Sequence, residues 1–316
     1  MIRLWRNSLG FLGVLGLLAS LGATAALAQD QDQNVIRSSV SLVMMDATIK
    51  TKAGQILGDL KKENFELRED GVAQDLRIFS RDELPLNVAL VLDLSDSIEP
   101  FLGPLREAAN TALASLKPED EVALFTFSTE AELRVPFTSD KAKVAESINA
   151  FKVGGATNIN DAIFVAAKYL LTAPPHGRRV IVLISDDVAT YSGGEGTHDI
   201  ITELVASDAV LYNLKIPGYN PPGTMLAASF EKGLVNIRKV MDSTGGEVFD
   251  VQNVANLDST FRALIQRIKT RYTIGYYTKA TAAEGKQHKL DLRLVPSFGK
   301  KGREYVVLTK TAFYVH

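Results

Sequence analysis

The sequence predicts a doubly wound α/β domain, a mostly parallel sheet flanked by helices, carried between two short β-rich flanks. Three observations predict this. Four short apolar runs are typical of strands buried on both faces: Val88–Leu92, Val122–Phe127, Val180–Ile184 and Val210–Leu214. Amphipathic stretches with helical spacing separate these runs, and alternating β-like patterns precede and follow them. Strand–helix alternation of this kind indicates an open sheet covered by helices.

The N-terminal flank, residues 35–84, reads as a set of short strands. Val40–Ile49 is a strand candidate, and Lys52–Gln55 follows it as a turn. Phe65–Glu69 alternates apolar and polar residues, and Asp70-Gly71 is a typical hairpin turn. We predict that Leu76–Phe79 is the return strand of this hairpin. This flank has few bulky apolar residues and can form only a thin core. It therefore needs a partner element for stability.

The α/β domain is predicted to span residues 87–269. Its helices are expected at Leu102–Leu116, Ile163–Leu170, Leu234–Met241 and Leu257–Ile268. Gly245-Gly246 is a fitting stop after the third helix, and the proline in Ala131–Pro136 predicts an edge strand there.

The C-terminal flank, residues 271–316, returns to β-like alternation at Tyr272–Tyr277, Lys289–Leu294 and Tyr305–Leu308. The economical interpretation is one discontinuous β-sandwich built from residues 35–84 and 271–316. The alternative is two independent β elements packed on the α/β domain.

Residues 1–28 have the pattern of a secretory signal peptide. Arg3 and Arg6 precede the apolar stretch Gly10–Leu21, and Ala26-Leu27-Ala28 forms a cleavage site. The alternative, an uncleaved membrane anchor, is disfavoured because the apolar stretch is shorter than the ~20 residues of a span. No later stretch is long and apolar enough to span a membrane. We therefore expect a periplasmic or secreted protein.

Composition narrows the possible activities. A net charge of −2 argues against a nucleic-acid-binding protein, and the lack of cysteine excludes disulfide scaffolds and thiol catalysis. The chain has no P-loop, no G-x-S-x-G and no G-x-G-x-x-G motif. His176 and His198 are the histidines of the α/β domain available as a general base, and both are predicted in loops. We therefore expect no catalytic residues and no enzyme activity.

Oxygen-bearing side chains follow the predicted strands. The first apolar strand ends in Asp93-Leu-Ser95-Asp-Ser97, a glycine-rich segment carries Thr157, and another strand ends at Asp186. The carboxyl ends of parallel strands meet at one edge of the sheet, where ligands bind. Hydroxyl and carboxylate oxygens suit Mg²⁺, Mn²⁺ or Ca²⁺. Taken alone, the first of these segments is better explained by ordinary helix N-capping.

Together, the pattern D-x-S-x-S, the G-x-T segment and the apolar strand followed by Asp resemble the metal-ion-dependent adhesion site of von Willebrand factor type A domains. The resemblance covers residues 87–269. It implies that Ser95, Ser97 and Thr157 are hydroxyl ligands, and that Asp93 and Asp186 bind the metal directly or through water. It further implies a partner protein that supplies an Asp or Glu carboxylate.

The flanks resemble the exported VWFA-related acidobacterial-type family, which has no single activity. We therefore expect a divalent-cation-dependent, adhesion-type binding module. The alternative is a structural or assembly module with a vestigial metal site, which binds through the β-sandwich.

One residue departs from the type A pattern, in which glycine usually follows the last aspartate. Asp187 stands there in this chain. Its carboxylate either adds a metal ligand or points to solvent. With Asp93, Asp96 and Asp186, it places four negative charges near one edge, which repel one another without a cation.

Overall fold

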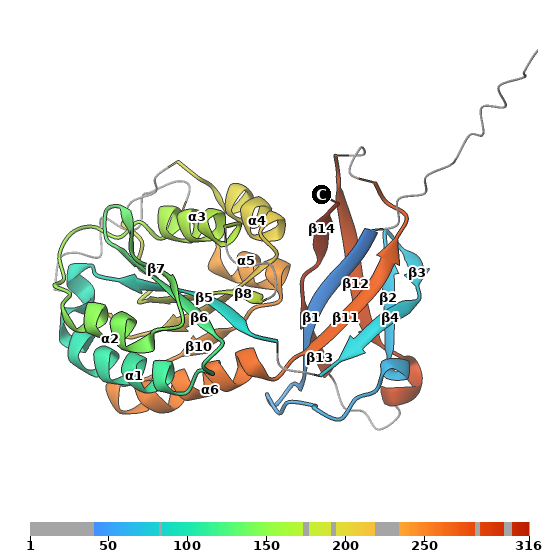
Figure 1. The fold of residues 1–316 in the computed structure, drawn as a ribbon, viewed down its shortest axis with the longest axis horizontal. Coiled ribbons are helices and arrows are strands. Elements are labelled where there is room, and N and C mark those ends of the chain that lie inside the picture. The colour runs from blue at the N-terminus through green and yellow to red at the C-terminus, as the bar shows by residue number, and fades with distance from the viewer. Residues whose placement is uncertain are drawn as a thin grey trace, which may run out of the picture. The chain divides into compact units, whose positions relative to one another are not determined.

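The computed structural model describes residues 41–81, 84–172, 177–190, 194–218, 234–281, 285–299 and 305–315 (Figure 1). The predicted signal peptide, residues 1–28, and His176 lie outside this part of the chain. None of the helices in the described ranges has the length and apolar character needed to cross a membrane.

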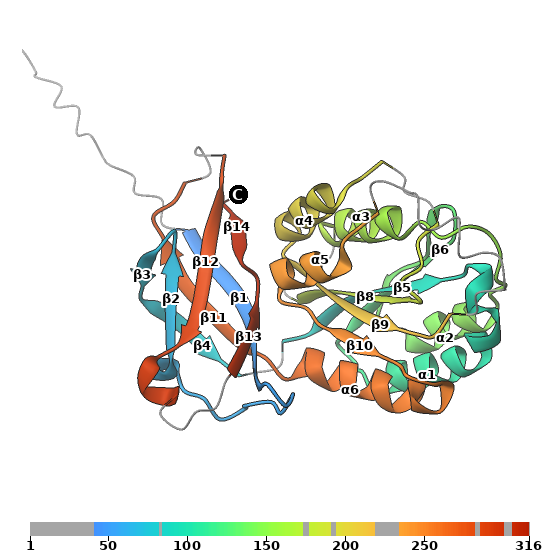
Figure 2. The ribbon, with the colours of Figure 1, turned by 180° about the vertical axis from the view of Figure 1, so that it is seen from behind.

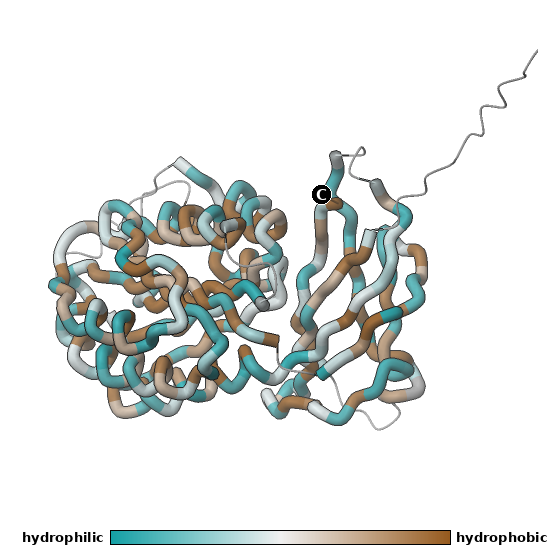
Figure 3. Tube along the Cα trace, in the orientation of Figure 1, coloured by the Kyte–Doolittle hydropathy of each residue, from teal (hydrophilic) through white to brown (hydrophobic). Residues whose placement is uncertain are grey.

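A six-stranded sheet forms the centre of the α/β part, in the order β10-β9-β8-β5-β6-β7. Its strands are β5 (Leu86–Asp93), β6 (Glu121–Phe127), β7 (Ala131–Thr138), β8 (Arg178–Ser185), β9 (Ala209–Lys215) and β10 (Val248–Asp250). All pair in parallel except β7, which is the antiparallel edge strand that the proline predicted. Every residue of β5 is buried, which explains its unbroken apolar run. Figure 3 shows hydrophobic residues along these central strands.

Helices cover both faces of this sheet (Figures 1 and 2). One apolar core joins it to α1 (Leu102–Ala114), α2 (Lys141–Asn149) and α6 (Leu257–Lys269). A second core on the opposite face joins it to α3 (Ile159–Leu170), α4 (Thr197–Ala206) and α5 (Ile237–Thr244). Short 3₁₀ turns lie at η1 (Lys62–Asn64), η2 (Asp96–Phe101), η4 (Val254–Asn256) and η6 (Pro296–Gly299). The predicted doubly wound architecture is confirmed.

Three helix predictions need correction. Helices α2 and α4 were not predicted, and His198 lies in the first turn of α4 and not in a loop. The helix expected from Leu234 begins at Ile237, because the Asn236 side chain accepts from the Lys239 amide and caps the helix there. Gly245 ends that helix in the left-handed conformation, with φ of 79°, as predicted.

Both flanks contribute strands to two antiparallel sheets. One has the order β13-β1-β11-β4 and the other β14-β12-β2-β3. The N-terminal strands are β1 (Ser41–Thr51), β2 (Phe65–Glu69), β3 (Val72–Gln74) and β4 (Leu76–Ser80), and the C-terminal strands are β11 (Tyr272–Thr278), β12 (Gln287–Leu294), β13 (Tyr305–Thr309) and β14 (Ala312–Tyr314). The two sheets share one apolar core, so the predicted single β-sandwich is confirmed.

The prediction for the hairpin after β2 was wrong in one respect. Asp70 and Gly71 both have positive φ, 48° and 86°, as a two-residue turn requires. Pairing therefore resumes at once, with Val72 opposite Glu69, and β3 is the return strand. Strand β4, predicted for that role, pairs with β11 in the other sheet.

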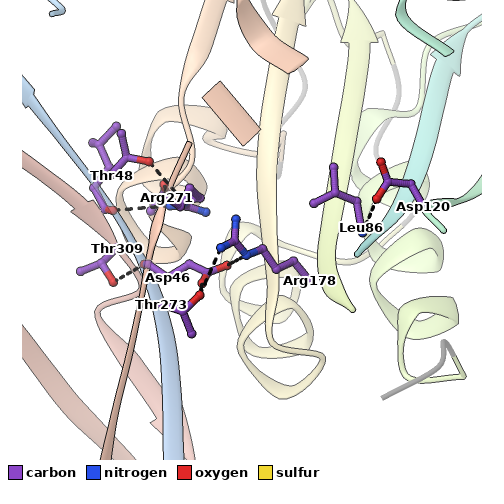
Figure 4. A network of polar contacts seen from close by, with 10 residues as sticks. Asp46, Thr48, Leu86, Asp120, Arg178, Arg271, Thr273 and Thr309 are labelled. Carbon is purple, nitrogen blue, oxygen red and sulfur yellow. Dashed lines mark hydrogen bonds and ion pairs between the residues drawn. The ribbon is translucent and has the colours of Figure 1, made fainter. Parts of the chain in front are cut away.

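Buried polar contacts connect β8 with β1 and β11 (Figure 4). The Arg178 guanidinium lies 3.3 Å from an Asp46 carboxylate oxygen and donates to Thr273 Oγ1 at 3.1 Å. Thr273 in turn donates to Asp46 at 3.0 Å. Nearby, Arg271 donates to Thr48 Oγ1 at 3.1 Å. The buried guanidinium groups of Arg178 and Arg271 need such partners.

Candidate metal site at the sheet edge

The turn after β5 places three predicted ligands together. Asp93, the last residue of β5, is fully buried. Its Oδ1 accepts a hydrogen bond from the Ser95 amide at 2.9 Å. The hydroxyls of Ser95 and Ser97 lie 3.1 Å apart. The D-x-S-x-S segment therefore forms one compact turn with two adjacent hydroxyls beside a buried carboxylate.

Burial changes the pKa of the Asp93 carboxylate. Desolvation raises the pKa of Asp93 to about 6, and the nearby negative charge of Asp186 acts in the same direction. Hydrogen bonds from the Ser185 hydroxyl, at 2.7 Å, and from Ser95 oppose this rise. A buried carboxylate in this state gains stability from any positive charge placed next to it.

The glycine-rich segment lies directly against this turn. The Gly154 amide donates to the Leu94 carbonyl at 2.7 Å. Thr157 is buried, its amide donates to Thr190 Oγ1 at 2.8 Å, and its carbonyl accepts from the Thr190 amide at 3.0 Å. Asn158 then caps α3. Thr157 is thus held between the turn after β5 and the segment that follows β8.

Asp186 follows β8 at the same edge and is also buried. Its Oδ1 accepts from the Val188 amide at 3.0 Å, whereas its buried Oδ2 has no hydrogen-bond partner in the described part of the chain. Such an orphaned carboxylate oxygen is costly unless a cation or a water satisfies it. The backbone at Gly218 covers this carboxylate, because a Cβ there would lie 2.0 Å from Oδ2. The loop after β9 therefore reaches the site.

Asp187 differs from both of the expected alternatives. Its φ is 62°, a left-handed conformation that glycine adopts freely, which explains why glycine suits this position. Its half-buried carboxylate accepts two hydrogen bonds from Asn213 Nδ2, at 2.9 Å each, and lies 3.9 Å from Lys215 Nζ. Burial raises the pKa of Asp187. The side chain is thus bonded to β9 and does not simply face solvent.

The donor set fits a hard divalent cation. Two buried carboxylates and three hydroxyls lie on segments that hydrogen bonds connect, and one carboxylate oxygen is orphaned. Sequence reasoning missed Ser185, which donates to Asp93 and accepts from the Asp187 amide at 3.0 Å. Its position at the end of an apolar strand, directly before Asp186, is the sequence feature that could have identified it. His198, the candidate base within the described residues, lies exposed in α4.

Comparison with known proteins gives one family match that covers this edge. Residues 88–189 match the family model of the von Willebrand factor type A domain, a range that includes all five predicted ligands. The inter-alpha-trypsin inhibitor heavy chain H4 of Bos taurus is 33% identical over 119 residues, which are 34% of this chain and 13% of that protein. The chain thus spans only about an eighth of the length of that relative.

Two solved structures resemble this chain at low sequence identity. A von Willebrand factor type A protein from Catenulispora acidiphila is 13% identical with a TM-score of 0.49, over 80% of this chain and 73% of that one. Proximal thread matrix protein 1 from the mussel byssus, in a structure described with a zinc-occupied MIDAS motif, is 16% identical with a TM-score of 0.47. That match covers 64% of this chain and 50% of the other.

Proposed function

Because residues 88–189 form a von Willebrand factor type A domain, we propose that this chain is a divalent-cation-dependent, adhesion-type protein-binding module. The orphaned, buried Oδ2 of Asp186, beside the hydroxyl-bearing turn at Asp93, is the observation that carries this proposal. Asp93, Ser95, Ser97, Thr157 and Asp186 hold Mg²⁺, Mn²⁺ or Ca²⁺ in it.

The composition of the donor set indicates which chemical group of a partner protein would bind the ion. Three of the five ligands are neutral hydroxyls, and a carboxylate that acts through water donates little charge to the ion, so the cation stays electrophilic and keeps a coordination position open. When bound, the cation supplies an electropositive centre at the sheet edge. A carboxylate from an Asp or Glu of a partner protein fills that open position, and partial burial of the edge strengthens its attraction to the cation. The chain's own residues orient the site and exclude water from it.

We also propose that the protein is exported and that it binds without catalysing a reaction. The signal-peptide pattern of residues 1–28 supports export to the periplasm or the medium. The exposed position of His198 in α4 supports a binding role without catalysis. Without His198 as a base beside them, the buried carboxylates serve as metal ligands.

A Mn²⁺ titration of the full mature chain tests this proposal, with electron paramagnetic resonance to count the free ion. We expect one Mn²⁺ bound at the sheet edge in wild type and at least tenfold weaker binding there in Thr157→Ala, which removes one hydroxyl ligand. Thr172→Ala, an exposed threonine outside the site, is the matched control and should bind as wild type does. Equal binding by Thr157→Ala and wild type would show that this edge is not the metal site.

Partner chemistry needs a second readout. Water-proton relaxation of the Mn²⁺-loaded protein reports water on the ion, and a peptide carrying a single glutamate should displace that water. The same peptide with glutamine should not. An equal effect of the two peptides would overturn carboxylate capture, and would favour the alternative in which the β-sandwich binds partners through a cation-independent surface.

A further inference from the structure

A second group of metal-ligating side chains lies in the β-sandwich, remote in sequence from the first. Glu69 ends β2, Asp70 begins the turn that follows, and His288 lies on β12, the neighbour of β2 in its sheet (Figures 1 and 2). His288 Nδ1 is 2.9 Å from Asp70 Oδ2 and 3.6 Å from Glu69 Oε1. One ligand atom from each of the three lies within 4.8 Å of the others.

Hydrogen bonds from neighbouring residues fix the positions of the Glu69 and Asp70 carboxylates. Thr278 Oγ1 donates to Glu69, at 2.7 Å from Oε1 and 2.9 Å from Oε2. The other Asp70 oxygen accepts from the Lys289 amide at 2.9 Å. Outer contacts of this kind hold metal ligands in a fixed orientation. The His288 and Glu69 side chains are 4% and 9% exposed, whereas Asp70 is 47% exposed and leaves a route from solvent.

Tyr276 gives an independent indication of a ligand. This residue of β11 is fully buried, and its hydroxyl has no hydrogen-bond partner among the residues that the structure describes. The Glu69 carboxylate is nevertheless close enough to raise the pKa of Tyr276, in addition to the effect of burial. The buried Tyr276 hydroxyl thus lies beside the Glu69 carboxylate of the cluster without a hydrogen bond of normal geometry, and an added ligand atom there would satisfy it.

We propose that Glu69, Asp70 and His288 bind a transition-metal dication of the Zn²⁺ type. Two ligands bound at ~2.1 Å to one ion are at most ~4.2 Å apart, so the distances from His288 Nδ1 to the two carboxylates, 3.6 Å and 2.9 Å, are compatible with a shared ion. One imidazole nitrogen with two carboxylate oxygens favours Zn²⁺ over Mg²⁺. The exposed side of Asp70 leaves a coordination position open. The ion would connect the β2–β3 turn to β12, independently of the site at the sheet edge.

A Co²⁺ titration of the metal-free mature chain tests this site, because Co²⁺ replaces Zn²⁺ and its visible absorption reports coordination. Asp70→Asn is the key variant, since asparagine tolerates the left-handed backbone at this turn and only the charge is lost. We expect at least tenfold weaker Co²⁺ binding in Asp70→Asn and loss of the absorption band in His288→Gln. Asp93→Asn should retain the band, which separates this site from the first.

The matched control is Asp208→Asn. Asp208 also has positive φ, 53°, and a half-exposed side chain, which is ion-paired with Lys310. It should bind Co²⁺ as wild type does, and excess Zn²⁺ should abolish the band. Equal Co²⁺ binding by wild type and Asp70→Asn would overturn the proposal, and so would a band that Asp93→Asn abolishes. The cluster would then be an ordinary pairing of His288 with two carboxylates.

Discussion

Replacement of Asp93 by asparagine should stabilise the metal-free protein and abolish its response to cations. The carboxylate is fully buried, and its pKa is raised to about 6 from an ordinary value of 3.8. At about 1.36 kcal/mol per pKa unit, ionised Asp93 costs the metal-free fold about 3 kcal/mol at neutral pH. Asparagine keeps the shape and the acceptor for the Ser95 amide but carries no charge.

The stability difference between Asp93→Asn and wild type should depend on pH. Between about pH 4 and 6 the folded protein holds the Asp93 proton more tightly than the unfolded chain does. The contribution of Asp93 to the free energy of unfolding is therefore fully present below about pH 4 and is lost as the pH rises through 6. Asp93→Asn should exceed wild type by about 3 kcal/mol at pH 7.5, and the difference should vanish near pH 4.

Urea unfolding in EDTA measures this difference, and a second series with Mg²⁺ measures the cation response. A cation at ~100 times its dissociation constant should stabilise wild type by about 2.7 kcal/mol and leave Asp93→Asn unchanged. The control is Asp96→Asn, an exposed carboxylate in the same turn, which should behave as wild type in EDTA. If metal-free Asp93→Asn is less stable than wild type at pH 7.5, the argument from burial is refuted.

Three further substitutions have defined outcomes. Gly218→Ala directs a Cβ onto Asp186 Oδ2, so Mn²⁺ titration should show at least tenfold weaker binding with little change in fold. Asp187→Asn should lower Mn²⁺ affinity less than tenfold in the same titration, because Asp187 is bonded to β9 and acts on the ion only through its charge. Arg178→Ala removes the buried ion-pair partner of the half-buried Asp46, and urea unfolding should show a loss of about 3–5 kcal/mol.

Matched controls accompany these variants. Gly103→Ala adds a Cβ with no atom within 4 Å and should leave Mn²⁺ binding unchanged. Arg77→Ala breaks the exposed pair with Asp75 and should cost less than about 1 kcal/mol. An Asp187→Asn affinity loss as large as that of Thr157→Ala would contradict the assignment of Asp187 outside the ligand set. An Arg178→Ala loss no greater than that of Arg77→Ala would contradict a stabilising buried pair.

Much of the α/β fold could be predicted because its signal is local. Val88–Leu92 in β5 and Val180–Ile184 in β8 are buried on both faces, so these runs are apolar without a break, and oxygen-bearing residues follow them. Helix α4 was missed because it starts after glycines, and α2 because it buries only Val144 and Ile148. Weak apolar periodicity over so few turns does not reveal a helix.

Contacts between distant segments were not predictable in the same way. The hairpin at Asp70-Gly71 was recognised, yet the crossing of β4 to the other sheet depends on its pairing with β11 far along the chain. The bonds of Ser185 to Asp93 and of Asn213 to Asp187 likewise depend on which strands become neighbours. Asp70 and His288 are separated by 218 positions, and no spacing rule joins them.

Anomalous diffraction from a Mn²⁺-soaked crystal of the mature chain tests the central claim most directly. The account predicts a peak at the sheet edge with Asp93, Ser95, Ser97, Thr157 and Asp186 in its direct or water-mediated coordination sphere. A crystal with saturating Mn²⁺ and no peak at this edge would contradict it.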